Sequence, residues 1–108
     1  MSTIHPNVSV TEGQIALFCT KWRITELELF GSVLGDDFRP ESDIDVLVTF
    51  ALDTQWSLFD AVQMEDELKL IFGRDVDLVT RRSIERSRNY LRRQDILSSA
   101  RRVYAATG

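Results

Sequence analysis

Two aspartates at the start of an apolar segment are the residues of this sequence best suited to chemistry. Asp43 and Asp45 flank a single residue, and the segment Ile44-Asp-Val-Leu-Val-Thr-Phe50 is predicted to be a strand covered on both faces. Side chains two positions apart on a strand project from the same face. Two such carboxylates repel each other unless a cation, an arginine or a proton neutralises them, so the pair indicates a divalent metal site. The alternative is a turn closed by a salt bridge.

A third aspartate interrupts the next predicted strand. Asp77 lies between two apolar residues of segment 75–80. If this strand pairs beside strand 44–50, Asp77 reaches the same point as Asp43 and Asp45. Three hard oxygen ligands suit octahedral magnesium and leave positions for phosphate oxygens and water, as a phosphoryl-transfer site requires. The other acids nearby are assigned to solvent: Asp37, Glu41 and Asp75.

A glycine and a serine end the strand that comes before this pair of aspartates. Gly31 lets a backbone approach a ligand closely, and the N–H and hydroxyl of Ser32 can both donate to a phosphate oxygen. The Gly-Ser step alone is a weak signal. Its value comes from the gap of residues 33–42 that separates it from Asp43.

The elements that must position these residues follow from hydrophobic spacing. Ser9 and Glu12 have capping-box spacing and predict a helix over 10–22, followed by a strand over 24–30. Asp53 or Thr54 is expected to cap a helix that contains Trp56 and ends at Gly73. A short strand over 75–80 comes next.

The tail is predicted to contain one or two helices. The clearer one has apolar residues at three- and four-residue steps: Ile96, Leu97, Ala100, Val103 and Tyr104. The resulting order predicts a single α/β (α+β) domain over 1–108, with a small mixed three-stranded sheet and helices packed on it.

Charge is divided unequally along the chain. Residues 1–80 contain 5 Lys or Arg against 15 Asp or Glu, a net of −10, whereas residues 81–108 contain 8 Arg against 2 acids, a net of +6. Such a tail is either a solvated helix surface or a patch for phosphates or an acidic partner. Arginine pairs bidentately with phosphate and carboxylate, which favours the patch.

Composition excludes several classes of protein. No apolar run approaches the ~20 residues of a membrane span, and one cysteine, Cys19, allows no intrachain disulfide. We therefore expect a cytoplasmic protein without a membrane partner, in which Cys19 packs as a small apolar residue. His5 is expected to lie in a frayed N-terminus without a catalytic role. Trp22, Trp56 and the phenylalanines are assigned to the core.

The motif Gly31-Ser32…Asp43-x-Asp45 resembles the signature of the DNA polymerase β-like nucleotidyltransferases. The segments Leu29-Phe30-Gly31-Ser32 and Arg39-Pro40-Glu41-Ser42-Asp43-Ile44-Asp45-Val46-Leu47-Val48 look like its minimal nucleotidyltransferase (MNT) branch, encoded beside HEPN-domain toxins. The resemblance covers nearly the whole chain, and the third carboxylate matches Asp77.

The resemblance implies that Gly31 and Ser32 hold a nucleoside triphosphate while Asp43, Asp45 and Asp77 hold two Mg²⁺ ions. It implies a transfer of AMP from ATP to a hydroxyl, expected to be a tyrosine of a HEPN toxin, with this chain as the antitoxin. Direct nucleic-acid binding is not expected, and assembly with itself or with the toxin stays open. Many members have an arginine where this chain has Gly35, so the activity level is open too.

Two rival functions compete with this interpretation. The first is an inactive nucleotidyltransferase fold that neutralises the toxin by contact, with the arginine tail in the interface. The intact Asp43, Asp45 and Asp77 oppose it, whereas Gly35 favours it. The second is nucleotidylation of a small molecule such as an aminoglycoside. A chain this short is expected to have an open cleft, which suits a macromolecular acceptor better.

Overall fold

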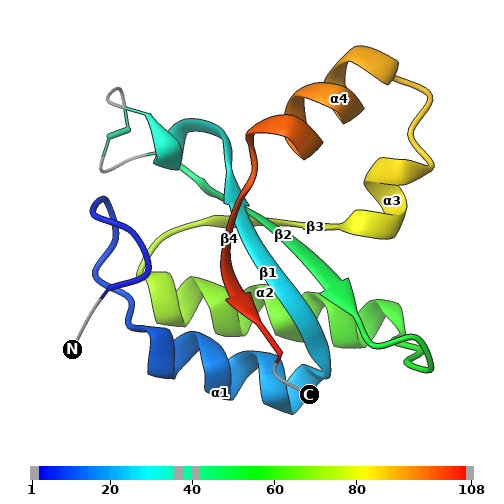
Figure 1. The fold of residues 1–108 in the computed structure, drawn as a ribbon. Helices are drawn as coiled ribbons and strands as arrows, with labels where there is room; N and C mark the ends of the chain where they lie inside the picture. The colour runs from blue at the N-terminus through cyan, green and yellow to red at the C-terminus, as the bar shows by residue number, and fades with distance from the viewer. Residues whose placement is uncertain (1–2, 36–37, 40–41, 107–108) are drawn as a thin grey trace.

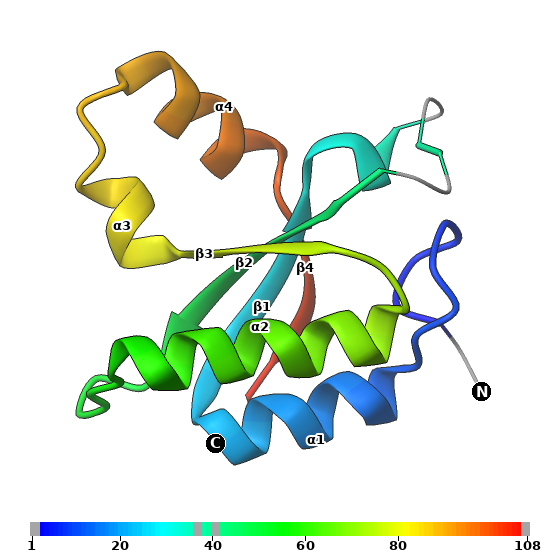
Figure 2. The same cartoon turned by 180° about the vertical axis from the view of Figure 1, so that it is seen from behind.

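The computed structural model describes residues 3–35, 38–39 and 42–106. The elements follow in the order α1 (Glu12–Trp22), β1 (Ile24–Phe30), the 3₁₀ helix η1 (Gly31–Leu34), β2 (Ile44–Phe50), α2 (Leu58–Phe72), β3 (Val76–Thr80), α3 (Arg81–Glu85), α4 (Tyr90–Ser99) and β4 (Arg101–Ala105). Helices α1 and α2 lie side by side along one face of the sheet, and α3 and α4 lie on the other side (Figures 1 and 2). No helix in these described ranges is long and apolar enough to cross a membrane.

The strands form a mixed sheet in the order β3-β2-β1-β4. Strand β1 is antiparallel to both β2 and β4, whereas β2 and β3 are parallel. The parallel pair is the one predicted to bring Asp77 beside the other aspartates, and it is present. The mixed α/β class is confirmed.

The prediction of three strands is wrong, because the tail returns to the sheet. Helix α4 ends at Ser99 and the extended backbone of Ala100 leads into β4, which contains Val103 and Tyr104. Tyr104 pairs with Leu27 of β1. A β-branched residue and an aromatic suit a strand as well as a helix, and pairing satisfies the backbone groups that β1 would otherwise leave at a sheet edge.

Both helix caps differ from the sequence prediction. Thr11 caps α1, because its hydroxyl accepts from the backbone N–H of Gln14 while the Gln14 side chain accepts from Thr11 N–H. Ser57 caps α2 by the same reciprocal exchange with Asp60. The predicted helix over 10–22 therefore begins at Glu12. The proposed caps Ser9, Asp53 and Thr54 lie before the helices, and so does Trp56.

Two apolar clusters pack on opposite faces of the sheet. The larger lies under α1 and α2 and includes Val46 and Val48, while the smaller joins Leu47 to α3 and α4. Alternate side chains of β2 therefore enter different clusters, as expected of a strand covered on both faces. Buried Cys19 lies in the larger cluster, and burial raises the pKa of its thiol to about 12.

Candidate active site

The three predicted carboxylates lie at the beginnings of β2 and β3. Asp45 and Asp77 are direct partners in the parallel register, and Asp43 comes one residue before β2. Ile44 and Val76, the residues directly before Asp45 and Asp77, are also register partners, and their side chains enter the larger core under α1 and α2. The carboxylates of Asp45 and Asp77 therefore project from the opposite face, on the side of α3 and α4.

Asp45 is the least exposed carboxylate of the three. Asp43 and Asp77 are exposed, whereas Asp45 is half-buried. Burial raises the pKa of Asp45, the negative charges of Asp77 and Asp43 raise it further, and the positive charge of Arg92 partly opposes them. The arrangement thus holds uncompensated negative charge at this point, which is the condition under which a carboxylate cluster attracts a cation.

Gly31 is needed because of Asp45. Its φ is +77°, in the left-handed region, and a Cβ built at Gly31 would overlap the Oδ2 atom of the Asp45 carboxylate. Glycine therefore meets two needs here: it adopts the positive φ of the turn from β1 into η1, and its missing side chain leaves room for the Asp45 carboxylate. Ser32 follows within η1 and is half-buried, and its carbonyl accepts a hydrogen bond from the Gly35 N–H.

A cavity of about 620 Å³ opens beside Asp45. We call it the Asp45 cavity. One wall is Phe30, Gly31, Leu34, Gly35 and Asp45; the other comes from α4 and β4 and comprises Arg92, Asp95, Ile96, Ser99 and Arg101. Of the five predicted site residues, Gly31 and Asp45 line this cavity, whereas Ser32, Asp43 and Asp77 do not.

Sequence reasoning missed the second wall of the Asp45 cavity. Arg92, Asp95 and Arg101 approach Asp45 only because α4 folds back over the sheet and β4 pairs with β1. The arginine-rich tail was the one available signal, but it could not distinguish Arg92 from its arginine neighbours.

The donor chemistry of the site fits magnesium. All three aspartates offer hard carboxylate oxygens, and Asp45 and Asp77 share a register position. In the described part of the chain, however, no three His, Cys, Asp or Glu side chains are grouped closely enough to hold a metal ion. Side-chain movement of Asp43 or Asp77 would be needed to close a ligand set around Asp45.

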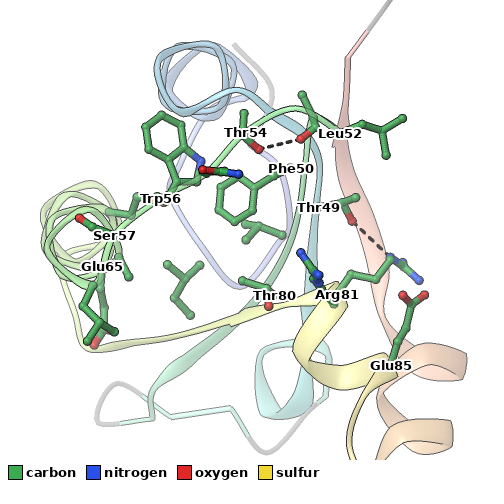
Figure 3. A pocket seen from close by; sticks show the side chains of 18 residues that line it. Thr49, Phe50, Leu52, Thr54, Trp56, Ser57, Glu65, Thr80, Arg81 and Glu85 are labelled. Atoms are coloured by element: carbon green, nitrogen blue, oxygen red, sulfur yellow. Dashed lines mark hydrogen bonds between the residues drawn. The ribbon is translucent and has the colours of Figure 1, made fainter.

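A second cavity, of about 680 Å³, lies at the other ends of β2 and β3 (Figure 3). We call it the Trp56 cavity; its walls include Phe50, Trp56, Thr80 and Arg81, and none of the three predicted carboxylates. Trp56 meets Trp22 edge to face at 5.3 Å between ring centroids. Among described atoms its Nε1 is buried without a hydrogen-bond partner.

The structure also shows where other residues singled out from the sequence lie. His5 is buried rather than frayed, and its Nδ1 accepts from the backbone N–H of Asn7 at 3.1 Å. Asp75 is exposed, as predicted. Phe59 is 88% exposed, so the assignment of every phenylalanine to the core is wrong. Asp37 and Glu41 lie outside the described residues.

Comparison with known proteins gives a family and a set of relatives. The nucleotidyltransferase domain family matches residues 13–103. Two relatives from Methanocaldococcus jannaschii, both named protein adenylyltransferases, are 34% identical over 64 residues and 32% identical over 78 residues. The first match covers 59% of this chain and 64% of the relative, and the second covers 72% and 82%. This chain thus spans just under two thirds of the first relative.

Solved structures share the fold. A chain in the crystal structure of a toxin-antitoxin with AMP-PNP superposes with a TM-score of 0.68 at 19% identity, over 91% of this chain and 76% of that chain. A chain in the complex of a tri-AMPylated Shewanella oneidensis HEPN toxin with an MNT antitoxin gives a TM-score of 0.59 at 20% identity, over 88% and 70%. The family match spans Gly31, Asp45 and Asp77, and this chain therefore belongs to the nucleotidyltransferase domain family.

Proposed function

We propose that this chain is a magnesium-dependent protein adenylyltransferase that moves AMP from ATP to a hydroxyl group of a HEPN-domain toxin, and that it acts as the antitoxin of that pair. The observation that carries the proposal is the register pairing of Asp45 with Asp77 beside a glycine whose missing side chain makes room for Asp45. The names of the relatives, and of the toxin complexes that share the fold, support the choice of reaction and partner.

Each residue of the site has a part in the proposed reaction. Asp43, Asp45 and Asp77 would hold two Mg²⁺ ions, which when bound supply positive charge to offset the charge on the phosphoryl oxygens. Gly31 lets the backbone of η1 approach the triphosphate, and the N–H and hydroxyl of Ser32 donate to its oxygens.

The chemical step is an in-line displacement at the α-phosphorus. The acceptor oxygen forms a bond to this phosphorus, the bond to the bridging oxygen breaks, and pyrophosphate leaves with the bonding electrons. Asp77 is exposed and lies beside Asp45, so it can take the proton that the acceptor hydroxyl loses. A tyrosine is the acceptor we propose. The exposure of both Asp43 and Asp77 supports a macromolecular acceptor, because a side chain on a protein surface can reach them.

The test is transfer to the partner. The chain is incubated with α-labelled ATP, Mg²⁺ and a HEPN-domain protein proposed as its partner, and the acceptor is digested and analysed by mass spectrometry. We expect AMP on a tyrosine, pyrophosphate release in equal amount, and loss of both when EDTA is added. Label that never appears on the partner, although the two proteins bind each other, contradicts the proposal.

A second candidate function is neutralisation of the toxin by contact alone. Apolar side chains on the outer surface of α2 favour it, since Leu58, Phe59 and Leu70 are each more than 80% exposed. Exposed apolar patches commonly mark protein interfaces. Toxin activity measured with the chain but without ATP separates the two functions, because inhibition that needs no nucleotide supports contact alone.

A further inference from the structure

Helix α4 presents one charged face to the Asp45 cavity. Arg92, Asp95 and Ile96 are three and four residues apart and therefore share a side of the helix. Ile96 is buried against the smaller cluster, next to Phe30 and Leu47. This burial fixes the rotation of α4, and Arg92 and Asp95 line the cavity opposite Asp45.

A second arginine reaches the same cavity from the sheet. Arg101 is the first residue of β4 and pairs with Leu29 of β1, two residues before Gly31. It is exposed and is one of the residues that line the Asp45 cavity. Arg92 and Arg101 therefore reach one cavity from separate elements.

Three of the other six arginines of the tail are held by the protein itself. Arg81 pairs with Glu28 and donates to Thr49. Arg93 donates to the Glu85 carbonyl, and Arg102 pairs with Glu26 at 3.2 Å.

The two arginines of the Asp45 cavity differ from these. Within the described ranges, neither Arg92 nor Arg101 makes a side-chain hydrogen bond or an ion pair, and neither do the carboxylates of Asp45 and Asp95. Both residues are exposed, so no hydrogen bond or ion pair between described side chains has to break before an anion binds.

We infer that Arg92 and Arg101 bind the phosphate oxygens of the nucleotide and position its leaving pyrophosphate; this inference rests on the proposed function. A triphosphate entering the cavity meets the negative charge of Asp45, and the opposite wall supplies two positive charges. Guanidinium groups suit this task, because their donors form a planar fork that matches two phosphate oxygens. The cavity volume of about 620 Å³ lies within the usual range for small-molecule sites.

The rival explanation is that these arginines only offset the negative charge of the carboxylates in the cavity. It predicts a loss of stability on their removal and equal effects on all ligands. Phosphate binding instead predicts that only ligands with phosphates are affected. The two explanations therefore differ in ligand dependence.

The experiment compares three ligands on four proteins. Binding of ATP, pyrophosphate and adenosine is measured by calorimetry in the presence of Mg²⁺ for the unchanged chain, Arg92→Gln, Arg101→Gln and the control Arg88→Gln. Arg88 lies between α3 and α4, outside the cavity, and the control removes the same charge. Thermal unfolding of each variant checks the fold.

We expect each cavity variant to weaken ATP and pyrophosphate binding by roughly tenfold, as loss of a charged hydrogen bond does. Adenosine binding should not change, and Arg88→Gln should bind all ligands within about twofold of the unchanged chain because its charge is remote and screened. Arg92→Lys should recover part of the loss, since it restores the charge without the fork.

Two results overturn the inference. One is ATP binding by Arg92→Gln and Arg101→Gln equal to that of Arg88→Gln; the other is an equal loss for ATP and adenosine. Failure of the proposed function would give a different set of results. An unchanged chain that binds ATP, with the arginine dependence described, but transfers no AMP contradicts the reaction and keeps the phosphate contacts. An unchanged chain that binds no ATP overturns both.

Discussion

The two cavities at opposite ends of β2 and β3 are nearly equal in volume, at about 620 and 680 Å³, but differ in how their charges are paired. Each is lined by two acids and two arginines. In the Trp56 cavity, Arg81 is held by Glu28, and Glu65 pairs with Lys69 at 3.6 Å. The other two charged residues there, Arg82 and Glu85, have no ion-pair partner among the described residues. In the Asp45 cavity, none of the four charged residues has an ion-pair partner among the described residues.

This difference indicates which cavity is prepared for chemistry. At the Trp56 cavity, the ion pairs of Arg81 and Glu65 already neutralise half of the charged residues. The aromatic wall of this cavity continues into the core through Trp22 and Phe50. At the Asp45 cavity, the charges of Asp43 and Asp77 act on Asp45 as well. Free energy released by neutralising them becomes available only when a ligand or metal binds. The charge gathered around Asp45, and not cavity volume, therefore favours the Asp45 cavity as the proposed site.

The largest expected effect tests the three carboxylates proposed as metal ligands. Asp43→Asn, Asp45→Asn and Asp77→Asn should each lower AMP transfer by about a thousandfold or more, because each removes a charged oxygen from the metal ligands. Rates are measured with labelled ATP under saturating Mg²⁺. Gln55→Ala in the Trp56 cavity is the control and should transfer at the parental rate. A parental rate for Asp77→Asn would show that the third ligand is wrongly assigned.

A smaller effect is expected from the serine beside Gly31. Ser32→Ala should lower transfer by roughly ten- to a hundredfold, because one hydrogen bond to a charged phosphate is lost while the backbone N–H remains. Ser57→Ala, which removes the α2 cap next to the Trp56 cavity, should lower stability by about 1 kcal/mol and leave transfer unchanged. If Ser32→Ala transfers as fast as the parent, the Gly-Ser step is only a turn.

Stability measurements test the fit of Asp45 against Gly31. Gly31→Ala and Gly73→Ala both place a side chain at positive φ, but a Cβ meets nothing within 4 Å at Gly73 and overlaps the Asp45 carboxylate at Gly31. We expect Gly73→Ala to cost about 1 kcal/mol of unfolding free energy and Gly31→Ala about 2–3 kcal/mol. Urea denaturation at neutral pH measures both. Equal costs would mean that Asp45 moves aside freely.

The Trp56 cavity has its own matched pair. Trp22→Phe breaks the hydrogen bond from the Trp22 Nε1 to Glu67, which is 3.0 Å long, whereas Trp56→Phe removes an Nε1 that has no partner among the described residues. Both substitutions lose ring volume, but only Trp22→Phe removes a hydrogen-bond donor from the Glu67 carboxylate. We expect Trp22→Phe to be less stable than Trp56→Phe by about 1 kcal/mol in urea denaturation. The reverse order would point to an unseen partner of Trp56.

Much of the Asp45 side of the site could be predicted from the sequence, because the signals are local. The apolar run around Asp45 defines β2, and the interruption of a short strand at Asp77 marks the third carboxylate. Gly31 was expected to let the backbone approach a ligand closely; the structure adds that its φ is positive and that it leaves room for Asp45. Adjacent residues determine these features, so their spacing carries the information.

The rest could not be predicted, because it depends on distant contacts or on competing local signals. The steps from Ile96 to Tyr104 fit a helix, yet pairing with β1 makes the last residues a strand. Thr11 and Gln14 compete with Ser9 and Glu12 for the same cap. The wall formed by α4 and β4 is set by burial of Ile96 and by strand pairing, neither of which is visible in the local pattern.

The smallest expected effect is a pH dependence of stability in the metal-free protein. Burial first, and then the charges of Asp77 and Asp43, raise the pKa of Asp45, so its ionised form is disfavoured in the fold. Between the ordinary and the raised pKa the folded state binds more protons than the unfolded state, and stability falls as pH rises. Asp45→Asn stays neutral and escapes this loss.

Urea denaturation in EDTA should therefore show Asp45→Asn more stable than the parent at pH 7. The two should converge near pH 3, below the usual aspartate pKa of about 3.9. Asp75→Asn, exposed and outside the cavity, should show no such convergence. A constant difference between Asp45→Asn and the parent at both pH values would mean that the Asp45 cavity holds no uncompensated charge, and the contrast with the Trp56 cavity would then rest on shape alone.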